Sequence, residues 1–280
     1  MSPFPLTEQE IDAFIDMAFA EDIGPGDVTC STVIPADASL TATMNAREAT
    51  VVAGLPLVAP IFRRLDPACT VTAHTTDGEW LQPGDKLITI EGKARALLSA
   101  ERTALNIVQH LSGIATLTRQ YVDMIDGTDA RLLDTRKTIP GLRKLGKYAT
   151  GMGGAKNHRM GLFDAVMIKD NHIAVAGSIS KAVRSAKAAG RTDIQVECDT
   201  LEQVHEALQA GAHSLLLDNM PPAVLRSALD IVNSAIPCEA SGGVNLDTIL
   251  AIAETGVDYI SVGRLTQSAP AVDIGLDYSA

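Results

Sequence analysis

A repeating pattern of strand, loop and helix runs through the second half of this chain and limits its fold more than any other feature. The residues just past five of the predicted strands lie 28, 21, 23 and 22 positions apart. A spacing in the low twenties is typical of one β-α unit of a parallel barrel. The expected strands are Arg131–Asp134, Ala165–Ile168, Ile194–Glu197, Ser214–Leu217, Cys238–Ala240 and Tyr259–Val262, with Met152–His158 as a weaker seventh. The helices expected between them are Ser178–Ala189, Leu201–Ala210, Pro222–Ser234 and Leu246–Glu254.

The first part of the chain has a different pattern, with short strands and few helices, and predicts an α+β module. Thr7–Glu21 has one apolar face, and Thr7 and Glu10 have the spacing of a capping box. Further elements are expected as two short strands within Leu40–Val52, a helix Leu55–Leu65, strands Thr70–Thr76 and Lys86–Glu91, and a long helix from Leu97 to Ile125. We therefore expect an N-terminal domain over residues 1–115 and a barrel domain over 116–270, with a tail, 271–280, that returns to the first domain.

Composition narrows the class of protein. The 280 residues carry a net charge of −11, which argues against nucleic acid as a partner. The first residues lack the basic and apolar regions of a signal peptide, and no apolar run approaches 18 residues, so we expect no membrane contact. The four cysteines contain no CxxC pair, which predicts free thiols in the cytoplasm rather than a zinc site or disulfides.

Positive charge is concentrated in one window of this acidic chain. Residues 131–172 hold nine Lys or Arg and three Asp, a net charge of +6, which leaves −17 for all other residues. Arg143, Lys144 and Lys147 have the spacing of a solvated basic helix. The remaining charges cluster where strands end or loops turn, and such positions are usually functional. The window therefore predicts a local site for an anion.

The carboxyl ends of parallel barrel strands meet at one mouth, so residues that follow the strands should face one cavity. Glycines in two consecutive loops allow backbone N–H groups to approach a phosphate, although a tight turn would also explain them. Glu197 and Asp218 could hold ribose hydroxyls or Mg²⁺ bound to a diphosphate, or could pair with nearby lysines. The residues expected at this mouth are Arg136, Lys137, Lys169, Glu197, Asp218, Ser241, Gly242, Gly243 and Gly263.

Several long motifs resemble one enzyme family, quinolinate phosphoribosyltransferase (nicotinate-nucleotide pyrophosphorylase, carboxylating), over nearly the whole chain. They are EDIGPGDVT at 21–29, SAERTALNIVQHLSGIAT at 99–116, DTRKTIPGLR at 134–143, NHRMGL at 157–162, IKDNHI at 168–173 and EASGGV at 239–244. The resemblance implies an N-terminal sandwich domain, an incomplete β/α barrel and a homodimer. It also implies a transferase that joins quinolinate to 5-phosphoribosyl-1-diphosphate, with Mg²⁺, and releases nicotinate mononucleotide, CO₂ and diphosphate in de novo NAD biosynthesis.

The same resemblance implies roles for individual residues. Lys137, Lys169, Glu197 and Asp218 are expected to be catalytic, and Glu197 and Asp218 to meet the metal, directly or through diphosphate and water. Arg102 is expected to enter the site of the other subunit. The expected substrate-binding set is Arg102, Thr135, Arg136, Lys137, His158, Arg159, Lys169, Glu197, Asp218, Ser241, Gly242, Gly243, Val262 and Gly263.

Two positions depart from the family pattern, and three other functions compete. Arg264 and Gln267, beside the predicted phosphate loop, stand where a small residue and a histidine are expected. One competitor is a pyrophosphorylase-like protein associated with molybdenum transport, against which the intact motifs around Asn157 and Lys169 count. The others are an aldolase-type barrel with a Schiff base on Lys169 and a non-catalytic anion sensor, which would need neither Glu197 nor Asp218.

Overall fold

The computed structural model describes residues 3–279, which form two compact units. The described residues of Met1–Arg119 and Ser268–Ala280, with Lys144–Gly153, form the first unit. Gln120–Arg143 and Gly154–Gln267 form the second. The boundary expected at residue 115 falls within helix α4 (Ala94–Met124), a single uninterrupted helix of 31 residues.

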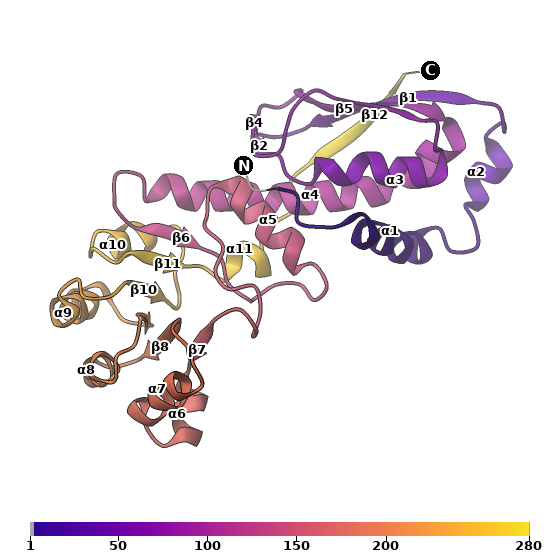
Figure 1. Ribbon diagram of the computed structural model, residues 1–280. Coiled ribbons are helices and arrows are strands. Elements are labelled where there is room, and N and C mark those ends of the chain that lie inside the picture. The colour runs from indigo at the N-terminus through magenta and orange to yellow at the C-terminus, as the bar shows by residue number, and fades with distance from the viewer. Residues whose placement is uncertain (1–2, 280) are drawn as a thin grey trace. The chain divides into compact units, whose positions relative to one another are not determined.

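The first unit is built on an antiparallel sheet with the strand order β12-β1-β5-β3. Its strands are β1 (Ser39–Ala46), β3 (Thr70–Ala73), β5 (Lys86–Lys93) and β12 (Ile274–Ser279), and a separate small sheet pairs β2 (Thr50–Val51) with β4 (Trp80–Leu81). Ala42, Met44 and Ala46 alternate along β1 and are fully buried, as expected for a strand with one face on a core. Helices α3 and α4 lie along one face of this sheet (Figure 1).

The helices of the first unit follow local sequence signals. Helix α1 (Glu8–Asp22) begins at the predicted capping box of Thr7 and Glu10, which is confirmed. Helix α2 (Val28–Val33) was not predicted, and it begins where Asp27 accepts the backbone N–H of Cys30 at 2.8 Å. The remaining helices are η1 (Leu55–Leu57), α3 (Val58–Leu65) and α5 (Arg143–Gly153), of which α5 takes only its first residue from the second unit.

The second unit contains a parallel sheet of six strands, an incomplete β/α barrel. Its strand order is β6-β11-β10-β9-β8-β7, and the two edge strands, β6 and β7, do not pair with each other. All six predicted strands are confirmed, as β6 (Arg131–Leu133), β7 (Val166–Ile168), β8 (Ile194–Cys198), β9 (Ser214–Asp218), β10 (Cys238–Ser241) and β11 (Tyr259–Ser261). The helices are α6 (Asp170–Ala176), α7 (Ile179–Ala188), α8 (Leu201–Ala210), α9 (Pro222–Val232), α10 (Ile249–Ala253) and α11 (Arg264–Gln267).

Two expectations about the barrel need correction. Met152–His158 is not a strand: Met152 belongs to α5, and this segment has only an isolated parallel bridge from Lys156 to Leu133. The helix expected from Leu246 begins at Ile249 instead. The Asn245 side chain accepts the N–H groups of Asp247 and Thr248 at 2.9 and 3.1 Å, and this turn delays the first helical residue.

No helix within residues 3–279 is both long and apolar enough to cross a membrane.

Candidate active site

The strand register brings the predicted charged residues to one edge of the parallel sheet. Ser241 is paired with Asp218, so both strands end at the same level. Lys169 follows β7 directly, and its ammonium group forms an ion pair with Glu197 on the neighbouring strand β8. The Glu197 side chain is 11% exposed and that of Lys169 is 39% exposed. The carboxyl-end cluster, defined as Lys137, Lys169, Glu197, Asp218, Ser241, Gly242, Gly243 and Gly263, is therefore contributed by neighbouring strand ends.

The glycine loops of this cluster are held in close contact with their neighbours. Gly242 has φ +93°, and a Cβ there would lie 2.1 Å from Asn219 Oδ1 and 2.9 Å from the Asn219 backbone nitrogen. Asn219 N donates to Ser241 O at 2.8 Å, which fixes this approach. Gly243 also has a positive φ of +63°. Only glycine meets both the conformational and the steric requirement at residue 242.

The second glycine loop lies against the lysine that follows β6. A Cβ on Gly263 would lie 2.8 Å from Lys137 Cδ, and Thr266 Oγ1 donates to Lys137 O at 2.8 Å. Buried Val262 donates its backbone N–H to Leu133 O at 3.1 Å, which joins this loop to β6. A lysine and two glycine-containing loops thus lie at the carboxyl ends, as expected for a site that binds phosphate.

Two arginines of the predicted substrate set lie near each other. Burial lowers the pKa of Arg159, and the positive charge of Arg136 lowers it further. Arg159 donates to Ala165 O at 3.1 Å and contacts Met167 Sδ at 3.5 Å. Within the described residues, Arg136 Nε is buried and has no hydrogen-bond partner. Two guanidinium groups whose charges act on each other, one with a buried unused donor, favour a bound anion.

The loops that carry these arginines are tied to the barrel by buried polar contacts. Asp134 is fully buried and accepts the His158 backbone N–H at 2.8 Å and the Asn157 side-chain amide at 2.7 Å. Thr135 Oγ1 accepts the Lys137 backbone N–H at 3.0 Å. These contacts fix the 157–158 segment and the backbone of Lys137 relative to the end of β6.

Arg143 joins the two basic loops, a role that the helical spacing of the sequence did not indicate. Its guanidinium donates to Thr138 Oγ1 at 3.1 Å, to Met160 O at 3.2 Å and to Arg136 O at 3.4 Å. The prediction that Arg143 belongs to a solvated helix face is therefore wrong. The position of Arg143 at the first residue of α5, inside the DTRKTIPGLR motif, was the only sequence signal.

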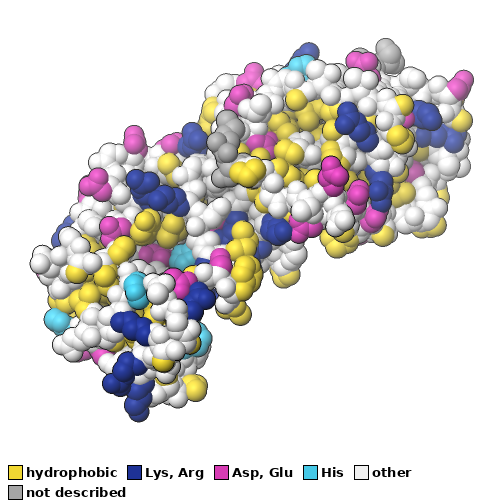
Figure 2. Space-filling view, viewed as in Figure 1, with side chains coloured by type: hydrophobic (Ala, Val, Ile, Leu, Met, Phe, Trp, Pro, Cys, Tyr) yellow, Lys and Arg dark blue, Asp and Glu magenta, His cyan; other side chains and the backbone are white. Residues whose placement is uncertain are grey.

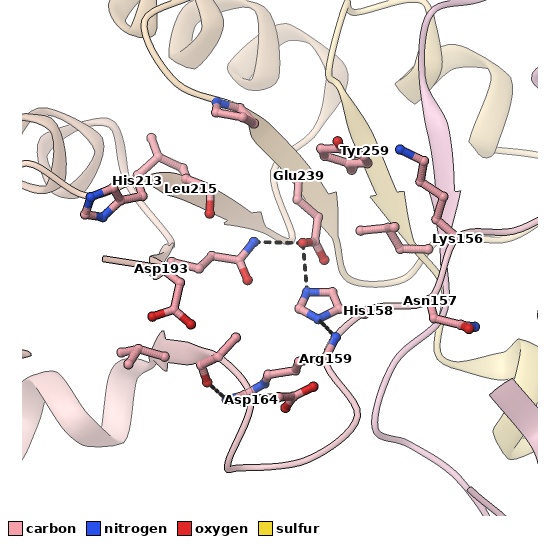
Figure 3. Close-up of a pocket in the computed structure, with 16 residues that line it drawn as sticks. Lys156, Asn157, His158, Arg159, Asp164, Asp193, His213, Leu215, Glu239 and Tyr259 are labelled. Carbon is pink, nitrogen blue, oxygen red and sulfur yellow. Dashed lines mark hydrogen bonds and ion pairs between the residues drawn. The ribbon is translucent and has the colours of Figure 1, made fainter. Parts of the chain in front are cut away.

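A cavity of about 420 Å³ is lined mainly by residues at or near the amino ends of the strands, and no member of the carboxyl-end cluster is among its lining residues. Its lining includes His158, Arg159 and Glu239 (Figure 3). Gln195, Ser214 and Tyr259, which also line it, lie at or near the first residues of their strands. The 157–159 loop therefore faces the interior of the barrel at the level of this cavity.

Not every basic residue lies at the candidate site. Figure 2 shows Lys and Arg side chains gathered over α6 and α7, the latter carrying Lys181, Arg184 and Lys187. Arg102 belongs to α4 in the first unit, and its side chain is 58% exposed with only a 3.8 Å ion pair to Glu101. Arg102 is thus the one member of the predicted substrate set that lies outside the barrel unit.

Comparison with known families accounts for both parts of the chain. Residues 27–112 match the family described as quinolinate phosphoribosyl transferase, N-terminal domain, and residues 114–277 match the corresponding C-terminal domain. The chain belongs to the quinolinate phosphoribosyltransferase family. The resemblance found in the sequence motifs is therefore confirmed.

Individual members of this family are similar along almost their whole length. A protein of Bacillus subtilis named probable nicotinate-nucleotide pyrophosphorylase [carboxylating] is 44% identical over 92% of this chain and 90% of its own length. The enzyme of that name from Mycobacterium leprae is 43% identical over 97% of this chain and 99% of its own. The structure of nicotinate-nucleotide pyrophosphorylase from Francisella tularensis covers 100% of both chains with a TM-score of 0.94 at 36% identity.

Proposed function

We propose that this chain transfers the phosphoribosyl group of 5-phosphoribosyl-1-diphosphate to quinolinate with loss of CO₂. The products are nicotinate mononucleotide, CO₂ and diphosphate, in the biosynthesis of NAD. The observation that carries this proposal is the buried, unused Nε–H of Arg136, whose charge also acts on Arg159, in a chain of this family. Quinolinate has two adjacent carboxylates, and guanidinium groups bind carboxylates through paired hydrogen bonds.

The transfer step needs charge stabilisation more than a side-chain nucleophile. The pyridine nitrogen of quinolinate forms a bond to C1 of the ribose while the C1–oxygen bond breaks and diphosphate leaves with the electron pair. Positive charge then develops on the sugar, and the carboxylates of Glu197 and Asp218 stabilise it. Lys169 and Lys137 meet the charge of the substrates' anionic groups. Once the ring nitrogen is quaternary, the ring takes up the electrons of the departing carboxylate, and C2 is then protonated.

We also propose Mg²⁺ as the metal, bound mainly through the diphosphate. Within residues 3–279 no three His, Cys, Asp or Glu side chains form a cluster suited to a metal ion. Glu197 is paired with Lys169, and Asp218 accepts a hydrogen bond from Asn219 Nδ2 at 2.6 Å. This donor set fits the usual binding of Mg²⁺, which takes one or two carboxylates together with substrate phosphates. When bound, the ion neutralises charge on the leaving diphosphate.

The proposed assembly is a homodimer in which Arg102 reaches the site of the partner. This proposal rests on the exposed guanidinium side chain of Arg102 and on the likeness to the family. We propose the cytoplasm as the compartment, because the four cysteines, Cys30, Cys69, Cys198 and Cys238, are buried free thiols.

The decisive experiment is incubation of the purified protein with quinolinate, phosphoribosyl diphosphate and Mg²⁺, with detection of nicotinate mononucleotide. Nicotinate, which lacks the 2-carboxylate, is the matched substrate control. We expect a kcat/KM for nicotinate at least 100-fold lower, since it leaves buried guanidinium groups without a partner. Comparable turnover of the two acids would contradict the assignment of the arginine pair.

Borohydride trapping separates this function from the aldolase alternative. The Lys169 side chain is held in an ion pair with Glu197, and a Schiff base on Lys169 would require the amine to leave this contact. We expect no covalent adduct with carbonyl compounds after reduction, as measured by mass spectrometry.

A further inference from the structure

We infer that Glu239 is a positioning residue, which holds His158 and through it the loop that carries Arg159. This inference rests on the proposed function and deepens it, because it concerns how the quinolinate site is formed. Glu239 lies on β10, two residues before Ser241, and it is 3% exposed. A carboxylate buried to this extent requires strong partners in the folded chain.

The register of the sheet places Glu239 inside the barrel. Glu239 and Glu197 are both paired with Leu216, and residues paired across a ladder point to the same face of a sheet. Glu239 therefore shares the face of Glu197 but lies on the next strand but one. From there its side chain points toward His158 (Figure 3).

One oxygen of Glu239 has two partners. Its Oε2 lies 3.1 Å from His158 Nε2 and accepts a hydrogen bond from Gln195 Nε2 at 2.8 Å. Burial by itself would raise the pKa of Glu239, but its side-chain hydrogen bonds, first of all that with His158 and also that with Gln195, outweigh burial and lower the pKa. Glu239 is thus held as a carboxylate, which can only accept hydrogen bonds.

The other ring nitrogen of His158 decides the tautomer. The backbone N–H of Arg159 donates to His158 Nδ1 at 2.7 Å, so Nδ1 is an acceptor and the ring proton resides on Nε2. Nε2–H is then the donor to Glu239. Both ring nitrogens are engaged inside the chain, and together they fix the backbone of Arg159 relative to β10.

This contact matters for the substrate because the next side chain belongs to the arginine pair. The backbone of the loop is held on its other side by Asp134, which accepts the His158 backbone N–H. Without the bond to Glu239 the ring would lose its contact with β10, and the position of the Arg159 backbone, which donates to the same ring, would be less well fixed. The expected consequence is weaker binding of quinolinate, with no change in the binding of phosphoribosyl diphosphate.

Glu239→Met tests this role, since methionine fills a similar volume and offers no carboxylate. We expect the KM for quinolinate to rise about tenfold or more, since a hydrogen bond to a charged group is lost. The KM for phosphoribosyl diphosphate should stay within about twofold, and Glu239→Gln, which keeps one acceptor oxygen, should restore most of the affinity. Gln195→Ala is the matched control: it removes the other partner of the same oxygen and should leave the KM for quinolinate nearly unchanged.

A double-mutant cycle with His158→Ala tests whether Glu239 acts on quinolinate binding through His158. If Glu239 acts through His158, the double variant should bind quinolinate no more weakly than His158→Ala alone. Additive losses, or an equal rise in both KM values, would overturn the positioning role. If Glu239→Met does not fold, calorimetry of quinolinate binding to Glu239→Gln tests the positioning role instead. An affinity of Glu239→Gln for quinolinate more than tenfold below that of wild type would also overturn this role. Absence of turnover in the wild-type protein would instead overturn the proposed function.

Discussion

At the scale of single residues, the candidate site is a set of charges whose partners are set by burial. Glu197 is nearly covered and has Lys169, whereas Arg136 is half-buried with an unused Nε–H. Glu197 and Lys169 have each other as partners without a ligand, whereas the Nε–H of Arg136 has no partner within the described residues. On this difference we base the proposal that Lys169 combines a structural and a catalytic contact, while Arg136 binds the substrate.

Lys137→Ala and Lys169→Ala should each lower kcat/KM by at least 100-fold, because each removes a positive charge that we propose meets an anionic group of the substrates. The fold should be retained in both variants, since neither lysine belongs to the apolar core. Steady-state kinetics and thermal unfolding measure the two effects. Lys144→Ala is the control, since Lys144 forms a solvent-exposed pair with Glu10 at 2.5 Å, and such surface pairs contribute little to stability. Near wild-type activity in either site variant would remove that lysine from the mechanism.

A glycine comparison tests the proposed phosphate loop. Gly242→Ala should lower stability and raise the KM for phosphoribosyl diphosphate about tenfold, because its Cβ would displace Asn219. Gly127→Ala has a similar positive φ of +84° with nothing within 4 Å, so it should show only the conformational cost of about 1–2 kcal/mol. If the two variants had the same stability and the same KM for phosphoribosyl diphosphate, the close contact at residue 242 would have no role in phosphate binding.

At the scale of elements, short helices and strands are fixed at their ends by side chains from distant segments. Asp27 begins α2 by accepting the Cys30 N–H, and its second oxygen accepts Ser99 Oγ on α4 at 2.8 Å. The hydrogen bonds with Cys30, followed by the bond from Ser99, lower the pKa of Asp27 from 3.8 to about 2. One carboxylate thus caps a helix and joins it to the longest helix of the chain.

The lowered pKa of Asp27 predicts a defined response to acid. A depressed folded-state pKa contributes stability that is complete above pH 3.8 and is lost as the pH falls toward about 2. The melting temperature of Asp27→Asn should therefore fall less between pH 4 and pH 2 than that of wild type. At pH 7, Asp27→Ala should lower the free energy of unfolding by about 1 kcal/mol, since the cap is lost. Asp37→Asn, which changes an exposed aspartate, serves as the control. An equal fall of the melting temperature between pH 4 and 2 in wild type, Asp27→Asn and Asp37→Asn would refute the link between Asp27 ionisation and stability.

At the scale of the whole molecule, the homodimer that we propose would bring residues of two chains to each site. The barrel unit supplies the carboxyl-end cluster and the arginine pair, and the first unit supplies Arg102. In a two-fold dimer each of two sites would then take residues from both chains.

Mixing two inactive homodimers tests this arrangement. Arg102→Ala and Lys169→Ala should each be nearly inactive. After exchange of equal amounts, about half of the dimers are mixed, and each has one intact site, so about a quarter of wild-type activity should return. Native mass spectrometry measures the exchange. Activity that remains at the level of the separate variants, despite complete exchange, would place Arg102 in the site of its own subunit or in no site.

The sequence alone determined the features that depend on neighbouring residues. The six barrel strands, the capping box at Thr7, the fold class and the family could all be predicted, because periodicity, caps and long motifs are local properties. The edge at which Lys169, Glu197 and Asp218 lie also followed from the sequence, since parallel strands separated by helices end on the same side. The roles assigned to these residues stay predictions.

Only the tertiary structure decided which distant side chains meet. Strand β12 pairs with β1, more than 220 residues earlier in the chain, and Glu239 meets His158 across 81 residues. Arg143 could be recognised as a bridge between two loops, rather than as a solvated helical residue, only from its three acceptors. Such contacts depend on register, barrel closure and burial, which no local pattern of residues encodes, because each arises from packing segments that are far apart in the chain.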